Sequence, residues 1–172
     1  LLADLALPDG SLAHVSTAGK LQPEERAALD LSSWTSALSG AEPVRVATMQ
    51  RFAEAFGPAG FRREIFRPVY GLAEATLFVS GATDRNTAPM ERHLDGVALR
   101  ENRIVPVTPE HPSAASVVGC GPVAANQRIV IVNPATRRQC GSDEVGEIWV
   151  AGGNVARGYW GKPAETEETF GA

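Results

Sequence analysis

A single carboxylate, Glu74, stands in an otherwise apolar part of the sequence. Most of the residues that surround it are apolar: Leu72, Ala73, Ala75 and Leu77. A charge at such a place is costly to bury unless a cation or hydrogen-bond donors meet it. The local chemistry therefore suggests a carboxylate directed at a metal-bound or polar ligand. A surface cap or salt bridge is the competing interpretation, and this window alone favours it.

The elements that would position Glu74 follow from the hydrophobic pattern before it. Residues 34–39 alternate as a strand does, and residues 40–43 must bend. A helix is expected from near Val46 to Phe56, because apolar residues recur on one helical face: Met49, Phe52, Ala53 and Phe56. A second strand is expected over residues 65–70. It leads to a tight turn at Gly71 and a short apolar helix that carries Glu74.

Strand, helix and strand in this order predict a βαβ unit with a parallel pair. The bends after Ser39 and after Tyr70 then lie at the same edge of the sheet, where ligands usually dock in α/β proteins. This geometry is a physical reason to treat residues 40–42 and 70–74 as one site.

The pattern of apolar and polar residues changes near Ala82. Short β-branched runs separated by Gly, Pro and Asn then follow, at residues 96–99, 103–107, 116–120, 127–132 and 147–150. Such runs are typical of a small barrel or sandwich. The predicted fold class is α/β, with a parallel βαβ portion in residues 1–82 and a small β-rich, barrel-like subdomain in residues 83–172.

Composition excludes several classes of partner. The net charge of −4 gives no reason to expect nucleic acid or an anionic membrane surface. No apolar run approaches the ~20 residues that span a bilayer. The two cysteines, Cys120 and Cys140, cannot form a dense disulfide framework, and their spacing does not indicate zinc. We therefore expect free thiols and a cytoplasmic location.

Residues 70–77 resemble the Tyr-Gly-x-Thr-Glu motif of adenylate-forming enzymes, in the form used by fatty acyl-AMP ligases. Four further stretches resemble motifs of this family, in its order and at plausible spacing: residues 30–34, 39–44, 146–150, and 152–160 followed by Lys162-Pro163. The resemblance runs from about Pro23 to the end of the chain. It implies a site for ATP and Mg²⁺.

For the adenine of ATP, the resemblance implies a slot flanked by Gly40, Ala41, Glu42 and Tyr70. Glycine and alanine let the backbone approach a flat ring closely, and the tyrosine ring offers a stacking surface. A plain strand-to-helix turn is the alternative interpretation of residues 40–42. The Tyr70 motif beside them favours the binding role.

For the phosphates, the resemblance implies that Gly71, Leu72 and Ala73 belong to the nucleotide-binding motif and that Glu74 is both catalytic residue and Mg²⁺ ligand. A hard cation prefers carboxylate oxygen. Ala73 stands where most relatives have a threonine whose hydroxyl would contact the α-phosphate. Thr76 is a weak substitute, because it should face elsewhere.

Other motif residues are expected to be structural. Trp149 should pack inside a barrel strand. Glu147 could form a salt bridge or bind a ligand, and the salt bridge is the favoured interpretation. Asn154, Tyr159 and Trp160, in the Gly-rich loop, should also have packing roles. Cys120 is expected to be a small buried thiol and not a nucleophile.

The implied function is a segment of a fatty acyl-AMP ligase, from the middle to late part of its large N-terminal domain. The full enzyme would convert a fatty acid and Mg·ATP to acyl-adenylate and pyrophosphate. It would pass the acyl group to an acyl carrier protein or a polyketide synthase carrier domain. Residues 83–107 fall where these ligases carry an insertion linked to excluding coenzyme A, although an ordinary surface hairpin would look the same.

Two alternatives stay open from the sequence: an acyl-CoA ligase of the same superfamily, and a non-catalytic scaffold or interaction module. The family's phosphate loop, its ribose-binding Thr-Gly-Asp motif and its catalytic lysine are absent from these 172 residues. We therefore expect this segment to be inactive alone.

Overall fold

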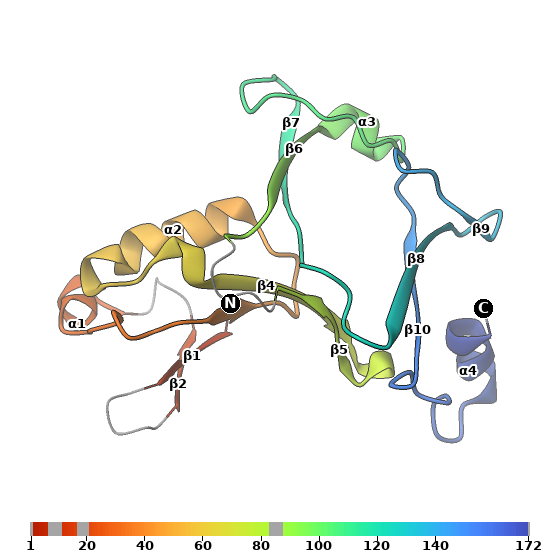
Figure 1. The fold of residues 1–172 in the computed structure, drawn as a ribbon, viewed down its shortest axis with the longest axis horizontal. Helices are drawn as coiled ribbons and strands as arrows, with labels where there is room; N and C mark the ends of the chain where they lie inside the picture. The colour runs from red at the N-terminus through yellow and green to blue at the C-terminus, as the bar shows by residue number, and fades with distance from the viewer. Residues whose placement is uncertain (1, 7–11, 17–20, 83–87, 172) are drawn as a thin grey trace.

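The structure is a computed structural model, and it describes residues 2–6, 12–16, 21–82 and 88–171. The mixed α/β class predicted from the sequence is confirmed (Figure 1). The strands are β1 Leu2–Ala6, β2 Leu12–Ser16, β3 Ala37–Ser39, β4 Phe66–Leu72, β5 Leu77–Gly81, β6 Glu91–Asp95, β7 Ala114–Val118, β8 Gln127–Asn133, β9 Arg138–Gln139 and β10 Glu147–Gly152. The α-helices are α1 Pro23–Ala27, α2 Val46–Phe56, α3 Gly96–Arg100 and α4 Pro163–Phe170, and the 3-10 turns are η1 Gly57–Ala59, η2 Arg63–Ile65 and η3 Ala73–Ala75.

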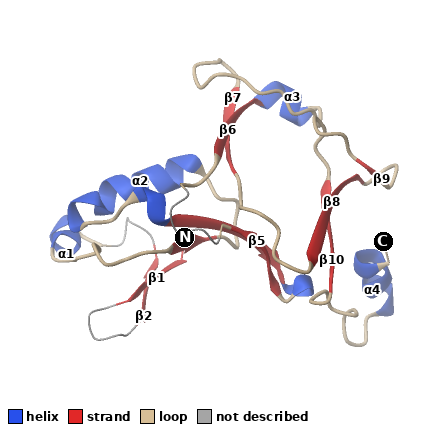
Figure 2. Ribbon diagram, viewed as in Figure 1, coloured by secondary structure: helices blue, strands red, loops and turns tan. Residues whose placement is uncertain are grey.

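The α/β half is built on a parallel pair of strands. β3 pairs with β4 in parallel, with Ser39 opposite Pro68, and β5 pairs with the other side of β4 in antiparallel fashion. α2 connects β3 to β4 and runs alongside this sheet (Figure 2). The predicted βαβ unit is therefore confirmed, and so are the bounds of its helix.

An aromatic core joins α2 to the sheet. Met49, Phe52 and Phe56 on one face of the helix are buried, as the helical spacing predicts. Phe52 meets the rings of Phe61 and Phe66 edge to face, with centroids 5.0 and 5.7 Å apart. Burial of one such side chain contributes roughly 1.5–3 kcal/mol. This cluster fixes the sheet that carries the site.

The turn predicted at Gly71 is wrong in one respect, because β4 continues through Gly71 to Leu72. The strand pairing shifts between Tyr70 and Gly71, and a Cβ at Gly71 would lie 1.6 Å from the carbonyl oxygen of Leu77. Glycine is therefore needed for close approach of β5, not for a turn. The expected apolar helix is reduced to the single 3-10 turn η3, because Thr76 and Leu77 adopt left-handed φ angles of 53° and 76° that reverse the chain.

The β-rich half contains two small sheets in the part of the chain that the structure describes. β6 and β7 form a two-stranded antiparallel sheet, and β8 lies between β10 and β9 in a three-stranded one. The strands expected at residues 127–132 and 147–150 are thus confirmed. Closure of these sheets into a barrel stays a prediction.

Two runs expected to be strand-like are not strands. Residues 96–99 belong to the helix α3, because the Asp95 carboxylate accepts hydrogen bonds from the backbone N–H groups of Val97 and Ala98 and caps its first turn. Residues 103–107 form only isolated bridges, Arg103 with Glu144 and Pro106 with Leu94. β-Branched residues alone did not decide the conformation at either place.

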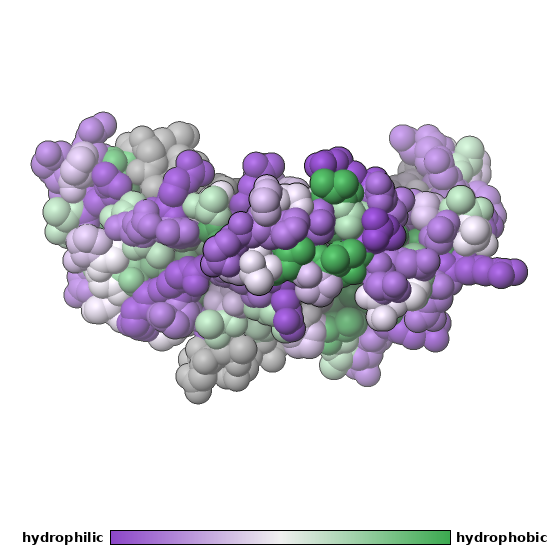
Figure 3. Space-filling view, turned by 90° about the horizontal axis from the view of Figure 1, so that it is seen from above, coloured by the Kyte–Doolittle hydropathy of each residue, from purple (hydrophilic) through white to green (hydrophobic). Residues whose placement is uncertain are grey.

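The described part of the chain has no helix that is long and apolar enough to cross a membrane. The face seen in Figure 3 is mostly hydrophilic, with apolar atoms gathered near its middle.

Candidate active site

The bend after β3 and the end of β4 lie at one edge of the sheet. Gly40 follows the end of β3, and its neighbour across the parallel pair is Val69 of β4. A Cβ at Gly40 would lie 2.7 Å from Val69 Cγ2 and 2.8 Å from the Val69 carbonyl oxygen. Residues 40–42 and 70–74 therefore extend from the same edge, as the predicted topology requires.

The bend after β3 is exposed and conformationally unusual. Ala41 has a left-handed φ of 64°, and both Ala41 and Glu42 are exposed. A non-glycine residue in this region costs about 1–2 kcal/mol. Such strained residues often cluster where a backbone meets a ligand. A hollow opens beside the bend, lined by Ser39, Gly40, Glu42, Pro43, Val44, Arg45 and Thr48.

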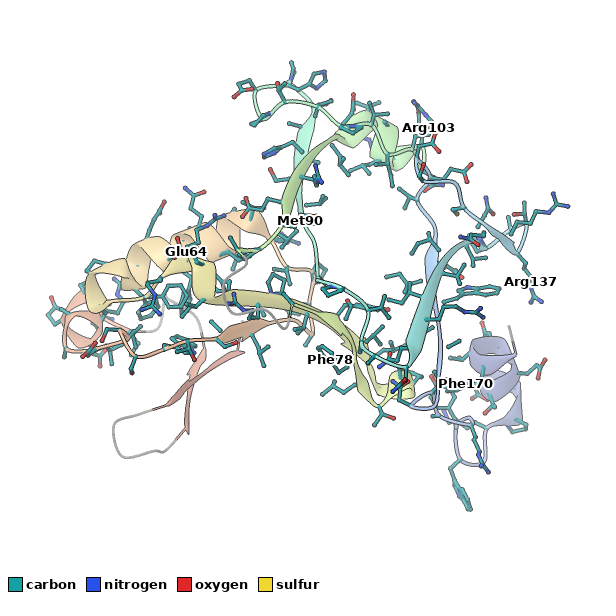
Figure 4. All side chains as sticks on the ribbon, in the orientation of Figure 1. Glu64, Phe78, Met90, Arg103, Arg137 and Phe170 are labelled. Atoms are coloured by element: carbon teal, nitrogen blue, oxygen red, sulfur yellow. The ribbon has the colours of Figure 1, made fainter. Side chains whose placement is uncertain are left out.

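A second and broader hollow lies at the end of β4. Tyr70, Leu72 and Glu74 line it from the α/β half, while Gly71 and Ala73 do not. The predicted site residues thus share an edge but line two separate hollows. Residues from the opposite side include Arg128, Val130, Trp149, Val150, Arg157 and Phe170. Phe170 lies on α4 and is labelled in Figure 4.

Glu74 lies in η3, and the Gly-rich loop of residues 152–160 holds this turn. The backbone N–H of Ala156 donates to the Glu74 carbonyl oxygen at 2.7 Å. The Thr76 hydroxyl donates to the Asn154 carbonyl oxygen at 2.6 Å, and the Asn154 side-chain N–H donates to the Ala75 carbonyl oxygen. Thr76 is therefore engaged with the loop and does not supply the hydroxyl that Ala73 lacks.

The Glu74 side chain is also held by this loop, because the Tyr159 hydroxyl donates a hydrogen bond to its Oε1. This bond, followed by one from the backbone N–H of Glu74, lowers the pKa of the Glu74 carboxyl. The same bond raises the pKa of the Tyr159 phenol. Near neutral pH the pair is thus an anionic carboxylate and a neutral phenol.

The arrangement fits a hard cation held together with phosphates. Glu74 is partly exposed and lines the hollow, and a carboxylate has about four lone-pair positions, so two hydrogen bonds do not exhaust it. No group of three or more His, Cys, Asp or Glu residues gathers in the part of the chain that the structure describes. Magnesium bound through one or two carboxylates plus substrate phosphates needs no such group.

Sequence reasoning missed the contact between Tyr159 and Glu74. It assigned Tyr159 a packing role, and the ring does contact Phe170 edge to face at 5.4 Å. The hydroxyl contact joins residues 85 positions apart, so no local spacing indicates it. The only available signal was the presence of a hydrogen-bonding side chain in a Gly-rich motif.

Other expectations from the sequence had mixed outcomes. Trp149 is partly buried at the hollow, and its indole N–H donates to Glu147 at 3.2 Å. Among the described residues Glu147 has no ion pair, so its expected salt bridge is not found. Cys120 is half-buried, and burial raises the pKa of its thiol, which agrees with an inert role.

Comparison with known proteins decides the family. A sequence model described as "AMP-binding enzyme" matches residues 6–160. The chain belongs to this family. Among curated AMP-binding enzymes, it is 48% identical to the medium-chain-fatty-acid–[acyl-carrier-protein] ligase JamA of Moorena producens over 151 residues, which are 87% of this chain and 25% of that protein. It is 39% identical to the long-chain-fatty-acid–AMP ligase FadD32 of Mycobacterium marinum over 165 residues, 96% of this chain and 26% of that protein.

A solved structure gives the same result for the fold. The fatty acyl-adenylate ligase of Legionella pneumophila, in complex with acyl adenylate and pyrophosphate, superposes with a TM-score of 0.80 at 41% identity. The match covers 87% of this chain and 26% of that one. The chain thus spans about a quarter of the length of the relatives it matches.

Proposed function

We propose that this chain is a segment of a fatty acyl-AMP ligase. The whole enzyme joins a fatty acid to the AMP part of ATP and releases pyrophosphate. One observation carries the proposal: the parallel pair β3 and β4 brings the bend at Gly40 and the motif ending in Glu74 to one edge of the sheet. Two relatives of this chain are named as ligases that join a fatty acid to an acyl carrier protein or to AMP.

In this proposal, the backbone of residues 40–42 and the ring of Tyr70 flank the adenine, one from each of the two hollows. Gly71, Leu72 and Ala73 continue the same motif toward the phosphates. Glu74 binds the Mg²⁺ that accompanies ATP. When bound, the ion would supply neutralisation of phosphate charge for the attack of the fatty acid carboxylate on the α-phosphorus, from which pyrophosphate leaves, and the protein's contribution would be positioning and electrostatic stabilisation.

The partner that receives the acyl group is then an acyl carrier protein or a carrier domain of a polyketide synthase. Two curated relatives named as ligases of the acyl carrier protein support this partner. We place the reaction in the cytoplasm, where ATP is available. The two free cysteines among the described residues are consistent with a reducing compartment.

The segment between β5 and the loop after α3 bears on the choice between an acyl-AMP ligase and an acyl-CoA ligase. We propose that residues 83–107 are the insertion that disfavours coenzyme A. In the described part of this segment, Glu91 of β6 forms an ion pair with Arg63 of the α/β half. The segment is thus attached to the α/β half.

The deciding experiment is Glu74→Gln in the full-length enzyme. The amide keeps the shape of the side chain and its hydrogen bonding but loses the charge that Mg²⁺ requires. We expect a loss of ATP–pyrophosphate exchange of at least about 100-fold, the usual cost of removing one preorganised electrostatic contact to the reacting groups. The thermal unfolding midpoint should change little, because Glu74 is partly exposed. Normal exchange in this variant would remove Glu74 from the mechanism.

A further inference from the structure

The contact between Tyr159 and Glu74 differs from the other bonds of the Gly-rich loop. Two bonds from this loop hold backbone carbonyl groups of the turn, those of Glu74 and Ala75, and would serve any turn of this shape, while the Asn154 carbonyl oxygen accepts from the Thr76 hydroxyl. Among the described residues of the loop, the Tyr159 hydroxyl is the group that reaches the Glu74 carboxylate, which lines the hollow. The loop therefore controls the direction of this carboxylate as well as the shape of the turn.

Tyr159 is in turn fixed by α4. Its backbone N–H donates to the Thr166 hydroxyl at 2.9 Å, and its ring packs edge to face on Phe170. Against the larger raising effect of Glu74 on the pKa of the phenol, the Thr169 side chain lies close enough to lower it. Two residues of one helix thus hold the backbone and the ring of Tyr159, and a third lies beside its hydroxyl. A phenol held in this way offers its hydrogen at one place, so the carboxylate it binds has a preferred orientation.

We propose that Tyr159, held by α4, is a positioning residue that orients the Glu74 carboxylate for the magnesium ion of Mg·ATP. This inference rests on the proposed function, because it takes Glu74 to be the metal ligand. The phenol occupies one carboxylate oxygen and leaves other lone pairs directed to the hollow. Residues that hydrogen-bond a metal ligand restrict its motion and thereby strengthen metal binding.

The test is Tyr159→Phe in the full-length enzyme, which removes the hydroxyl and keeps the ring on Phe170. The first measurement is binding of Mn²⁺ to the enzyme with a non-hydrolysable ATP analogue, followed by electron paramagnetic resonance. We expect about tenfold weaker Mn²⁺ binding, the lower end of the range for a lost partner of a metal ligand. In ATP–pyrophosphate exchange, the Mg²⁺ concentration for half-maximal rate should rise, while the KM for the fatty acid stays unchanged.

Trp160→Phe is the matched control, because the Trp160 side chain is adjacent in the loop and fully exposed. It should leave Mn²⁺ binding and the Mg²⁺ requirement unchanged. If Tyr159→Phe does not fold, Thr169→Val tests the same chain of contacts at an exposed position and should raise the Mg²⁺ requirement to a smaller extent. Unchanged Mn²⁺ binding in the folded variant would overturn the proposal, and so would tighter binding, which would mean that the phenol competes with the metal.

Glu74→Gln separates the two hypotheses. If that variant exchanges normally, the proposed role of Glu74 fails. If it loses exchange but Tyr159→Phe binds Mn²⁺ normally, only the positioning role fails. In a double variant, Tyr159→Phe should add nothing to Glu74→Gln, because the two residues act through one contact.

Discussion

Asp95, the last residue of β6, determines the conformation of the residues after it. Its Oδ1 accepts from the Val97 amide at 2.7 Å, from the Ala98 amide at 3.3 Å and from the Ser113 hydroxyl at 2.8 Å. The Ser113 bond, followed by the Val97 bond, lowers the pKa of the Asp95 carboxyl. A capping carboxylate thus converts an apolar, β-prone run into the first turn of α3. The same side chain ties α3 to the loop before β7.

This cap gives α3 a defined pH dependence. Because the folded-state pKa of Asp95 is below its ordinary value, its stabilisation is complete above the ordinary carboxyl pKa and is lost as the pH falls through the lowered one. Over that window the amides of residues 97–100 should lose protection against hydrogen exchange, taken relative to the intrinsic exchange rate at each pH. Asp95→Ala should accelerate the exchange at neutral pH, by roughly fivefold for an average N-cap. Asp95→Asn keeps a cap that does not titrate, so its exchange should lack the acid transition; an identical transition there would assign it to another group.

At the scale of elements, the pairing of β4 with β5 depends on the missing side chain of Gly71. An added methyl group would lie 1.6 Å from the Leu77 carbonyl oxygen, which is backbone and cannot rotate away. Gly71→Ala should therefore lower the free energy of unfolding by about 1–3 kcal/mol, as overpacking does. Denaturant unfolding measures this. Gly57→Ala is the control, because a Cβ there meets nothing within 4 Å and φ is −53°; an equal loss in both variants would contradict the steric explanation.

The antiparallel pair of β6 and β7 is the element on which the proposed exclusion of coenzyme A depends. β6 pairs with β7, Glu91 contacts Arg63, and Val118 packs against the core of the α/β half. Deleting residues 83–107 from the full-length enzyme should raise the yield of acyl-CoA from fatty acid, ATP and coenzyme A, measured by chromatography. Acyl-adenylate formation in the same samples is the control for folding. Glu91→Gln should raise the yield less, because it weakens only the ion pair. Equal yields of acyl-CoA from wild type and deletion would end the inhibitory interpretation.

At the scale of the whole molecule, periodicity predicted the parts of the fold that local burial determines. The helix α2 and the parallel pair follow from Met49, Phe52 and Phe56 at helical spacing between two apolar strands. Periodicity failed where one side chain or one close approach decided the outcome, as at Asp95 and Gly71. The shared edge of the candidate site was predictable because the carboxyl ends of parallel strands lie at the same edge of a sheet, although β4 continues to Leu72 beyond its pairing with β3. The contact from Tyr159 to Glu74 was not, because a contact between distant residues depends on how the two halves of the chain pack.

Whether this chain can bind nucleotide by itself also depends on the whole molecule, because the chain holds only part of the proposed site. Its part of the site offers an exposed bend, one aromatic ring and one carboxylate in two open hollows. Its sequence contains no phosphate loop rich in Ser, Thr and Gly, and the chain corresponds to about a quarter of its relatives' length. Proteins bind the phosphates of a triphosphate mainly through backbone N–H groups and cationic groups. The isolated 172-residue chain should therefore bind Mg·ATP weakly or undetectably in titration calorimetry, while the full-length enzyme binds it readily under the same conditions. Micromolar binding by the isolated chain would contradict this prediction. It would show that the chain has a complete nucleotide site somewhere other than the two hollows at β3 and β4.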